Sequence, residues 1–172
     1  MKYISSYTKL ANFGRELLDR TSLEQGLPII ADYAKDVIGA ERCSIYIYRA
    51  AHNILWTTLA DGVEKLVVDA DKGIVGACIK EKKPVLVNAP YNDPRFNQEI
   101  DHKTGYLTKN VACVPIFNST RQIIGVFQLL NKKEGEFDRD DANFMIFFAH
   151  FISGYLELAS FFREDEEFLN RI

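Results

Sequence analysis

The spacing of apolar residues divides the chain into a helical start, a β-rich middle and a helical end. Apolar side chains recur every three or four positions from Leu10 to Leu18 and again from Leu23 to Val37. This spacing places them on one side of an α-helix, so two helices are predicted before the first strand. Thr21 and Ser22 lie between the two runs and suit a helix break followed by an N-cap.

From Arg42 the apolar period changes to two, which predicts β-strands. Turn residues at His52 and Asn53, and at Asp61 and Gly62, separate three such segments and indicate an antiparallel meander. A short helix is expected to follow Gly73, before further strands. The predicted strands, in order, are CSIYIYRA, NILWTTLA, VEKLVVDA, VLVN, VACVPIFN and QIIGVFQLLN.

The polar segment 88–110 is much longer than the usual connection of about 4 to 6 residues. Loops of this length are usually functional or disordered. Four apolar residues are spread along this one and favour an ordered flap: Tyr91, Phe96, Ile100 and Tyr106.

After Phe137 a long helix is predicted, with a wide aromatic stripe whose first turns cover the sheet. The later turns run past the expected edge of the domain and need another apolar surface. We therefore expect a homodimer through the terminal helices, in which this stripe meets the stripe from Leu10 to Leu18 across a two-fold axis. The residues expected at that interface are Phe148, Tyr155, Leu158 and Phe162.

Composition limits the partners of the protein. The chain has 172 residues, 47% hydrophobic and 26% charged, as expected of one globular domain. The 21 Lys and Arg residues are scattered among 24 Asp and Glu residues, so nucleic acid is not an expected partner. The longest uncharged stretch, Ala142 to Leu156, is too short to span about 30 Å of hydrocarbon. The N-terminus has no signal-peptide pattern, and we expect a cytoplasmic protein without membrane insertion.

Cysteine and histidine usage argues against a metal site and against catalysis. Cys43, Cys78 and Cys113 lack CxxC spacing and neighbouring histidines, so they are expected to be small buried residues in a reducing compartment. The three histidines are far apart and have no carboxylates at metal-ligand spacing. No Ser-His-Asp arrangement, P-loop or catalytic acid pair stands out, and no cofactor requirement is expected.

Five segments, in this order and with these gaps, resemble a GAF domain of the phosphodiesterase and adenylate cyclase type. They are GIVG at 73–76, YNDPRFNQEIDHKTGYLT at 91–108, VPIFN at 114–118, IIGVFQLLNK at 123–132 and FDRDD at 137–141. The resemblance implies an α+β fold: a six-stranded antiparallel sheet, helices on one face, a ligand pocket on the other, and long terminal helices. It divides the chain into an N-terminal helix at 1–21, the GAF domain at 22–160 and a C-terminal helical extension at 161–172 toward an output domain.

In nucleotide-binding members of that family the pocket encloses a cyclic nucleotide. The start of the GIVG helix can offer backbone N–H groups and a favourable dipole to a phosphate, so Ile74 and Val75 are predicted contacts. Close packing of the glycines alone would also explain GIVG. The resemblance implies further contacts at the strands and in the long loop: Ser44, Asp61, Asn97, Asp101, Thr104, Thr108 and Gln128.

Simpler roles remain open for some of these positions. Asp61 precedes Gly62 and suits a turn, while Thr104 and Thr108 flank Gly105 and suit local caps. Gln128 stands where some relatives have an acid. An amide both donates and accepts hydrogen bonds, so this change bears on which base would fit.

The family also has an Asn-Lys, Phe, Asp-Glu signature. Asn131, Lys132, Phe137 and Asp141 match it in order, and Ala142 stands in place of the glutamate. The resemblance implies a structural ion pair between Lys132 and Asp141 that ties the last strand to the last helix. We expect Asp141→Ala to lower thermal stability and the neighbouring Asp138→Ala to have little effect.

These observations predict a small-molecule-binding regulatory domain and not an enzyme. The expected ligand is a cyclic nucleotide, cAMP or cGMP, or another small molecule, and the controlled output domain would be a nucleotide cyclase, phosphodiesterase or kinase. Two alternatives stay open. One is a GAF domain that only dimerises and binds no ligand. The other is a free methionine sulfoxide reductase, although the three cysteines match no paired redox set.

Overall fold

The computed structural model describes the backbone of residues 5, 7–8, 11–15, 23–60 and 66–169. It describes the side chains of these residues except those of 23–25, 58–60 and 159–169. Asp61, Leu10, Leu17 and Leu18, which the sequence analysis singled out, lie outside the described residues.

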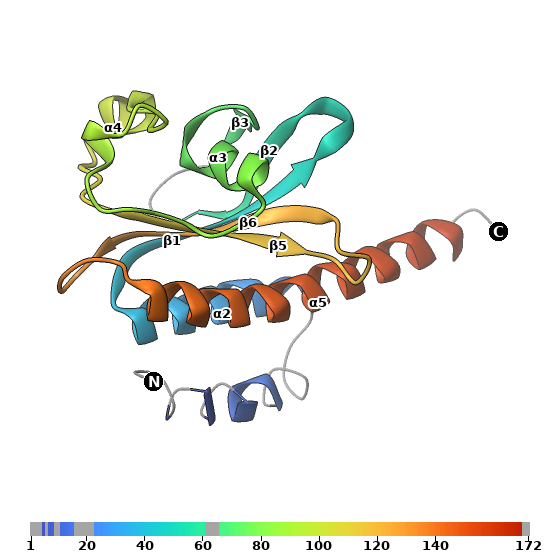
Figure 1. The fold of residues 1–172 in the computed structure, drawn as a ribbon. Coiled ribbons are helices and arrows are strands. Elements are labelled where there is room, and N and C mark those ends of the chain that lie inside the picture. Colours follow the sequence, from blue (N-terminus) through green and yellow to red (C-terminus); the bar gives the residue numbers. More distant parts are fainter. Residues whose placement is uncertain (1–4, 6, 9–10, 16–22, 61–65, 170–172) are drawn as a thin grey trace.

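Six antiparallel strands form one sheet in the order β3-β2-β1-β6-β5-β4 (Figure 1). Both halves are meanders, and they meet where β1 pairs with β6. The strands are β1 (Ala40–Arg49), β2 (Ile54–Ala60), β3 (Val67–Asp69), β4 (Val85–Val87), β5 (Val111–Phe117) and β6 (Ile123–Lys132).

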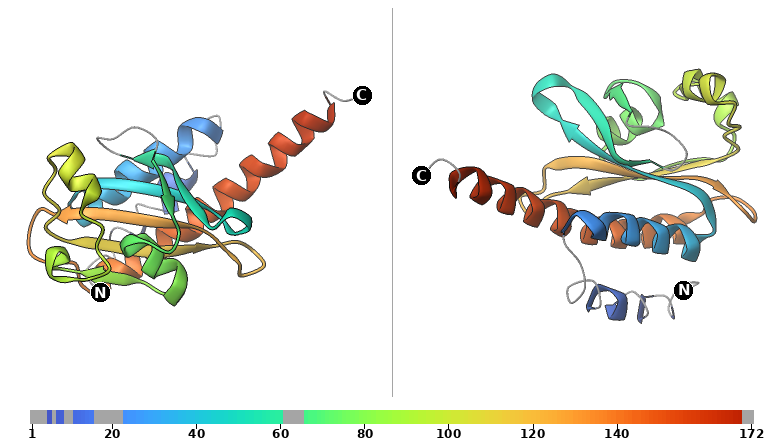
Figure 2. Two further views of the ribbon diagram at one scale, coloured as in Figure 1. Left: turned by 90° about the horizontal axis from the view of Figure 1, so that it is seen from above. Right: turned by 180° about the vertical axis from the view of Figure 1, so that it is seen from behind.

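Two long helices, α2 (Leu23–Ile38) and α5 (Arg139–Leu169), lie side by side on one face of the sheet (Figures 1 and 2). Two short helices, α3 (Gly73–Glu81) and α4 (Glu99–Thr104), lie on the other face. Two 3-10 turns, η1 (Ala50–His52) and η2 (Pro90–Asn92), follow β1 and β4. This architecture confirms the predicted α+β fold with its six-stranded antiparallel sheet.

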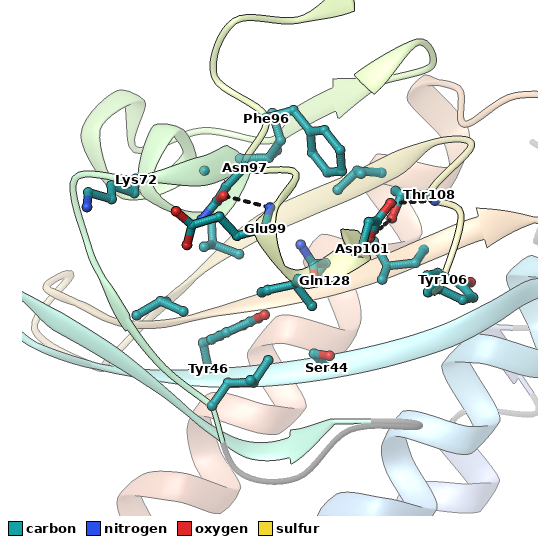
Figure 3. Close-up of a pocket in the computed structure, with 18 of the residues that line it drawn as sticks. Ser44, Tyr46, Lys72, Phe96, Asn97, Glu99, Asp101, Tyr106, Thr108 and Gln128 are labelled. Atoms are coloured by element: carbon teal, nitrogen blue, oxygen red, sulfur yellow. Dashed lines mark hydrogen bonds between the residues drawn. The ribbon is translucent and has the colours of Figure 1, made fainter. Parts of the chain in front are cut away.

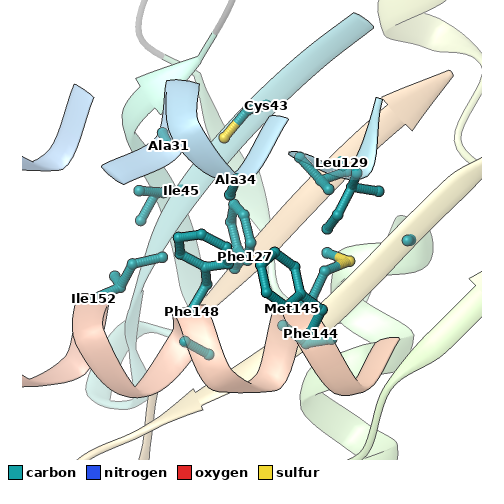
Figure 4. Close-up of a cluster of buried hydrophobic side chains, with 14 of the residues drawn as sticks. Ala31, Ala34, Cys43, Ile45, Phe127, Leu129, Phe144, Met145, Phe148 and Ile152 are labelled. Carbon is teal, nitrogen blue, oxygen red and sulfur yellow. The ribbon is translucent and has the colours of Figure 1, made fainter. Parts of the chain in front are cut away.

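The core between the sheet and the long helices combines aromatic and aliphatic side chains, with phenylalanine rings at its centre (Figure 4). Phe127 of β6 and Phe144 and Phe148 of α5 are fully buried. The rings of Phe144 and Phe148 meet edge to face with their centroids 4.9 Å apart. Since burying a Phe side chain contributes about 1.5 to 3 kcal/mol, this cluster is a main source of fold stability.

Strands β5 and β6 are covered on both faces, which explains their nearly continuous apolar sequences. Strand β6 lies close to β1 at Gly125. A Cβ atom at this position would lie 2.2 Å from the carbonyl oxygen of Tyr46, so a side chain there would push the strands apart. Glycine at 125 is therefore required for the central pairing of the sheet.

The long polar segment is ordered, as expected, but it contains the helix α4, which the sequence analysis did not predict. This helix has only six residues, EIDHKT, and Ile100 is its sole apolar side chain. Such a helix has no apolar periodicity that could identify it. We refer to residues 88–110 as the lid.

Two residues of the predicted α5 stripe, Phe148 and Tyr155, do not lie open for a partner, while the side chain of Phe162 lies outside the described ones. Phe148 is fully buried in the chain's own core. The hydroxyl group of Tyr155 accepts a hydrogen bond from the backbone N–H of Gly26 at 3.1 Å, because α5 and α2 cross closely there. The dimer interface predicted from these two residues is therefore largely an intramolecular contact.

N-terminal residues cover more of the same helical layer. The Tyr7 ring packs edge to face on Phe144 and Phe147, with both centroids 5.0 Å away. Phe13 stacks on Tyr33 of α2 at 4.8 Å. Leu158, in contrast, keeps 49% of its surface exposed. Among the described residues, no helix is both long enough and apolar enough to cross a membrane.

Candidate functional site

A cavity of about 240 Å³ lies between the sheet, the start of α3 and the lid (Figure 3). This is slightly below the range of about 300 to 1,000 Å³ that is usual for small-molecule sites. The predicted contact residues that the structure describes all line it: Ser44, Ile74, Val75, Asn97, Asp101, Thr104, Thr108 and Gln128. The sequence prediction therefore converges on one place in the fold.

The floor of the cavity carries a short row of polar groups. Gln128 of β6 pairs across the strands with Ser44 of β1, which also lines the cavity, and with Cys113 of β5, which is not among the described residues that line it. The side-chain Nε2 of Gln128 donates a hydrogen bond to the Cys113 sulfur at 3.5 Å, which orients the amide. Burial raises the pKa of the Cys113 thiol to about 12, so the thiol stays protonated. Burial also raises the pKa of Tyr46, whose hydroxyl stays protonated beside this row.

The start of α3 forms one wall, and its two glycines have different roles. Gly73 has a φ of +71°, a left-handed conformation that other residues rarely adopt. A Cβ on Gly76 would lie 2.6 Å from the carbonyl oxygen of Ala70, so this glycine allows close packing. Among the described residues, no side chain caps the start of α3, and Lys72 at the N-cap position makes no such bond. The first N–H groups of α3 therefore lack both an intrahelical and a side-chain partner, at the positive end of the helix dipole and beside Lys72.

The lid uses its own polar groups to hold its shape. The buried carboxylate of Asp101 accepts hydrogen bonds from the Tyr91 hydroxyl at 2.6 Å and from the backbone N–H and hydroxyl of Thr108, both at 2.8 Å. The bond to Asp101 raises the pKa of Tyr91. The Thr104 hydroxyl donates to the carbonyl of Ile100 at 2.8 Å. Asp101 and Thr104 thus line the cavity while bonding to the lid itself.

The N-terminal half of the lid is ordered by a turn and an aromatic contact. The Asn97 side chain accepts the backbone N–H of Glu99 at 3.0 Å and so starts α4. Phe96 packs on Tyr91 with ring centroids 5.3 Å apart. Asn97 therefore has a structural role at this point, whatever it contributes to a ligand.

The C-terminal end of the lid is fastened to the sheet by a group that the site prediction missed. The guanidinium of Arg42 lies 3.7 Å from the centre of the Tyr106 ring. The Tyr106 hydroxyl donates to Glu41 at 3.0 Å, and the Asn131 amide donates to the same carboxylate oxygen at 3.2 Å. These two donors lower the pKa of Glu41, and the bond from Asn131 has the larger effect. Burial, followed by the bond to Glu41, raises the pKa of Tyr106.

The connection from β6 to α5 contains a buried ion pair. The Lys132 ammonium contacts the Asp141 carboxylate, and their side chains are 8% and 0% exposed. Lys132 also donates to the carbonyl oxygen of Glu136 at 3.2 Å. The pair thus joins the last strand to the first turn of the last helix and is largely shielded from solvent.

Asp138 is more than a neighbouring acid, contrary to expectation. Its side chain accepts the backbone N–H of Asp141 at 2.9 Å, and the Asp141 side chain accepts the backbone N–H of Asp138 at 2.9 Å. This reciprocal arrangement is a capping box at the start of α5. We therefore revise the expectation that Asp138→Ala has little effect, because the substitution removes the helix cap.

Comparison with known proteins places this architecture in a family. The family model for the GAF domain matches residues 22–156. A probable 3',5'-cyclic phosphodiesterase, pde-5, of Caenorhabditis elegans is 28% identical over 165 residues, which cover 85% of this chain and 22% of that protein. A cGMP-specific 3',5'-cyclic phosphodiesterase of Drosophila ananassae is 31% identical over 171 residues, covering 80% of this chain and 15% of that protein. The chain thus spans less than a quarter of the length of these relatives.

Two solved structures extend the comparison of the fold. The GAF domain of the Acinetobacter phosphoenolpyruvate-protein phosphotransferase superposes with a TM-score of 0.77 at 18% identity, covering 92% of this chain and 96% of that one. The free methionine-R-sulfoxide reductase of Neisseria meningitidis superposes with a TM-score of 0.71 at 19% identity, covering 86% of each chain. At such identities the likeness concerns the fold alone.

Proposed function

The chain belongs to the GAF domain family. From this premise we propose that it is a regulatory domain whose cavity binds a cyclic nucleotide and prefers cGMP to cAMP. One observation carries the proposal: the uncapped start of α3, the polar row on the sheet and a folded lid converge on a single cavity. The similarity to the cGMP-specific phosphodiesterase of Drosophila ananassae favours cGMP.

The chemistry of the cavity suits a phosphate at one wall and a base on the floor. The N–H groups of Ile74 and Val75 and the ammonium of Lys72 favour an anion. Ser44 and Gln128 can each donate and accept hydrogen bonds, as recognition of a purine edge requires. Tyr46 adds a hydroxyl and an aromatic ring beside them.

Titration calorimetry with cGMP and cAMP tests this proposal. We expect cGMP to bind with a dissociation constant well below about 1 mM, and cAMP to bind more weakly. Gln128→Leu should weaken cGMP binding about fivefold or more, since it removes a hydrogen bond worth about 1 kcal/mol. Gln122→Leu, at the exposed β5–β6 turn, is the matched control and should leave affinity unchanged. If neither nucleotide binds below about 1 mM, the nucleotide proposal is wrong.

A non-catalytic role fits the cysteines better than a reductase role does. A nucleophilic thiol must reach the substrate and ionise. Cys78 and Cys113 are fully buried, and no cysteine is among the described residues that line the cavity. Burial raises the pKa of both thiols. Turnover of free methionine sulfoxide with a thiol reductant, abolished by Cys113→Ala, would overturn this part of the proposal.

We also propose that the domain forms a homodimer through the terminal helices, now centred on the distal part of α5. This helix continues past the edge of the sheet (Figures 1 and 2), and Leu158 on it is half-exposed. Sedimentation analysis should show a dimer that Leu158→Glu converts to monomer. Ile29→Glu, at an exposed position on α2, should leave the dimer intact. If Ile29→Glu instead converts the dimer to monomer and Leu158→Glu does not, the interface lies on α2.

A longer protein, such as the phosphodiesterases that this chain resembles in part, would use α5 as its output element. A ligand can shift such a helix only if it binds two states of the domain with different affinity. The required difference lies in the position of the lid, which covers the cavity and lines it with Phe96, Asp101 and Thr108. We propose that α5 passes this difference to a catalytic domain.

A further inference from the structure

The segment 131–141, which runs from the end of β6 to the first turn of α5, is bonded to both ends of the lid. These contacts bridge segments that are far apart in sequence. They form a physical link between the cover of the cavity and the helix on the opposite face of the sheet.

The first end of the lid is held by Asn88, at the end of β4. Its side-chain Nδ2 donates to the carbonyl oxygen of Phe137 at 3.1 Å, and its Oδ1 accepts the backbone N–H of Phe137 at 3.0 Å. Only an amide can make both bonds, because a carboxylate has no donor. Phe137 is buried and immediately precedes Asp138, the cap of α5.

The second end of the lid is held by Asn110, at the start of β5. Its Oδ1 accepts the backbone N–H of Lys132 at 2.8 Å, and its Nδ2 reaches the carbonyl oxygen of Gly135 at 3.4 Å. Its carbonyl oxygen accepts the N–H of Asn131 at 3.0 Å. Asn110 itself is buried.

Asn131 adds a second set of bonds at this end. Its side chain accepts the N–H of Lys109 at 2.6 Å and donates to the carbonyl oxygen of Leu107 at 2.8 Å. Its own backbone has a φ of +53°, a conformation that asparagine tolerates better than most residues. Both the start and the end of the lid are therefore hydrogen-bonded to the segment 131–141.

We propose that Asn88 and Asn110 are positioning residues that join the lid to the first turn of α5, so that lid closure over a ligand is transmitted to α5 through residues 131–141. The connection cannot follow the lid without moving the α5 cap, since Phe137 precedes Asp138 and Lys132 is paired with buried Asp141. The ligand in this inference is the one given by the proposed function. The mechanical link itself needs no ligand.

The link can be tested first on the free protein by hydrogen exchange. Asn88→Ala should speed amide exchange about tenfold both in the lid, at Thr108 and Gly105, and in the first turn of α5, at Asp141 and Ala142. Asn118→Ala is the matched control, since its Oδ1 accepts N–H groups in the β5–β6 turn away from the lid. It should change exchange only near that turn.

The coupling must also work in the opposite direction, because linkage is reciprocal. Asp138→Ala, which uncaps α5, should speed exchange at Thr108 in the lid. Asn88→Asp keeps the bond from Phe137 N–H and loses the other, so it should give an intermediate effect and serves if Asn88→Ala does not fold. Exchange changes confined to the immediate neighbours of each substitution would overturn the inference.

Binding separates this inference from the proposed function. With cGMP, the wild-type protein should gain exchange protection in both the lid and the first turn of α5, and Asn88→Ala should bind about five- to tenfold more weakly without protecting α5. Protection of the lid alone in the wild-type protein would overturn the link while leaving cGMP binding intact. If the wild-type protein binds no cGMP, the proposed function fails, and the ligand-free exchange experiments still decide the link.

Discussion

The two faces of the sheet are filled by different kinds of interaction. The face under α2 and α5 is packed with aromatic and aliphatic side chains, among them Phe127, Phe144 and Phe148. The pocket face and its margins bury polar groups such as Asp101 and Gln128, which are hydrogen-bonded to neighbouring protein groups. Substitutions on the helix face should therefore affect mainly stability, and substitutions on the pocket face should affect mainly lid geometry and binding.

The largest effect is expected on the helix face, from Phe148→Ala. Removing a fully buried ring leaves a cavity and should lower the free energy of unfolding by about 4 kcal/mol. Denaturant titration measures this loss, and Phe148→Leu should lose clearly less. A loss below about 1 kcal/mol for Phe148→Ala would mean that the two faces do not differ as described.

A smaller but still large effect is expected where the two faces are joined, from Asp141→Ala. The substitution strands the buried Lys132 ammonium and should cost about 3 kcal/mol. The double variant Asp141→Leu with Lys132→Met should recover most of this loss, because no buried charge remains. If the double variant is as unstable as Asp141→Ala, the loss comes from the capping box and not from the stranded charge.

The helix face was predictable because its signals are local. The apolar period in α5 and the alternation in β1 follow from side-chain geometry, and the continuous apolar runs of β5 and β6 follow from burial on both faces. The GAF resemblance located the cavity, since the positions that it marks and the structure describes come together there. The match of the GAF family model to residues 22–156 confirms that resemblance.

The polar margin of the pocket was not predictable in the same way. Asn88 and Phe137 are 49 positions apart, and Glu41 and Tyr106 are 65 positions apart. No periodicity connects such residues, because tertiary packing alone brings them together. The prediction that Phe148 and Tyr155 face a second copy was wrong for a related reason, since local spacing cannot tell an intramolecular partner from a second copy.

Asp138→Ala tests whether the capping box is separate from the ion pair. Loss of an N-cap side chain typically costs about 1 kcal/mol, so the effect should be clear but smaller than that of Asp141→Ala. Asp138→Asn keeps a capping oxygen and should retain most of the stability. Thermal melts of the three variants rank their losses of stability. Equal losses for Asp138→Ala and Asp141→Ala would show that the ion pair adds no stability beyond the capping box.

The smallest effect is expected at the exposed end of the lid, from Glu41→Gln. Bonds from Asn131 and Tyr106 lower the pKa of Glu41 below its ordinary value of 4.5, so the folded state favours the carboxylate. The resulting stabilisation is present above about pH 4.5 and is lost as pH falls through the lowered folded-state pKa. The melting temperature of Glu41→Gln should therefore lie slightly below that of the wild-type protein at neutral pH, and the gap should close in acid.

Glu134→Gln, at an exposed position in the β6–α5 connection, is the control for charge loss alone. A gap for Glu41→Gln that stays constant down to about pH 3 would show that the carboxylate charge does not help fasten the lid.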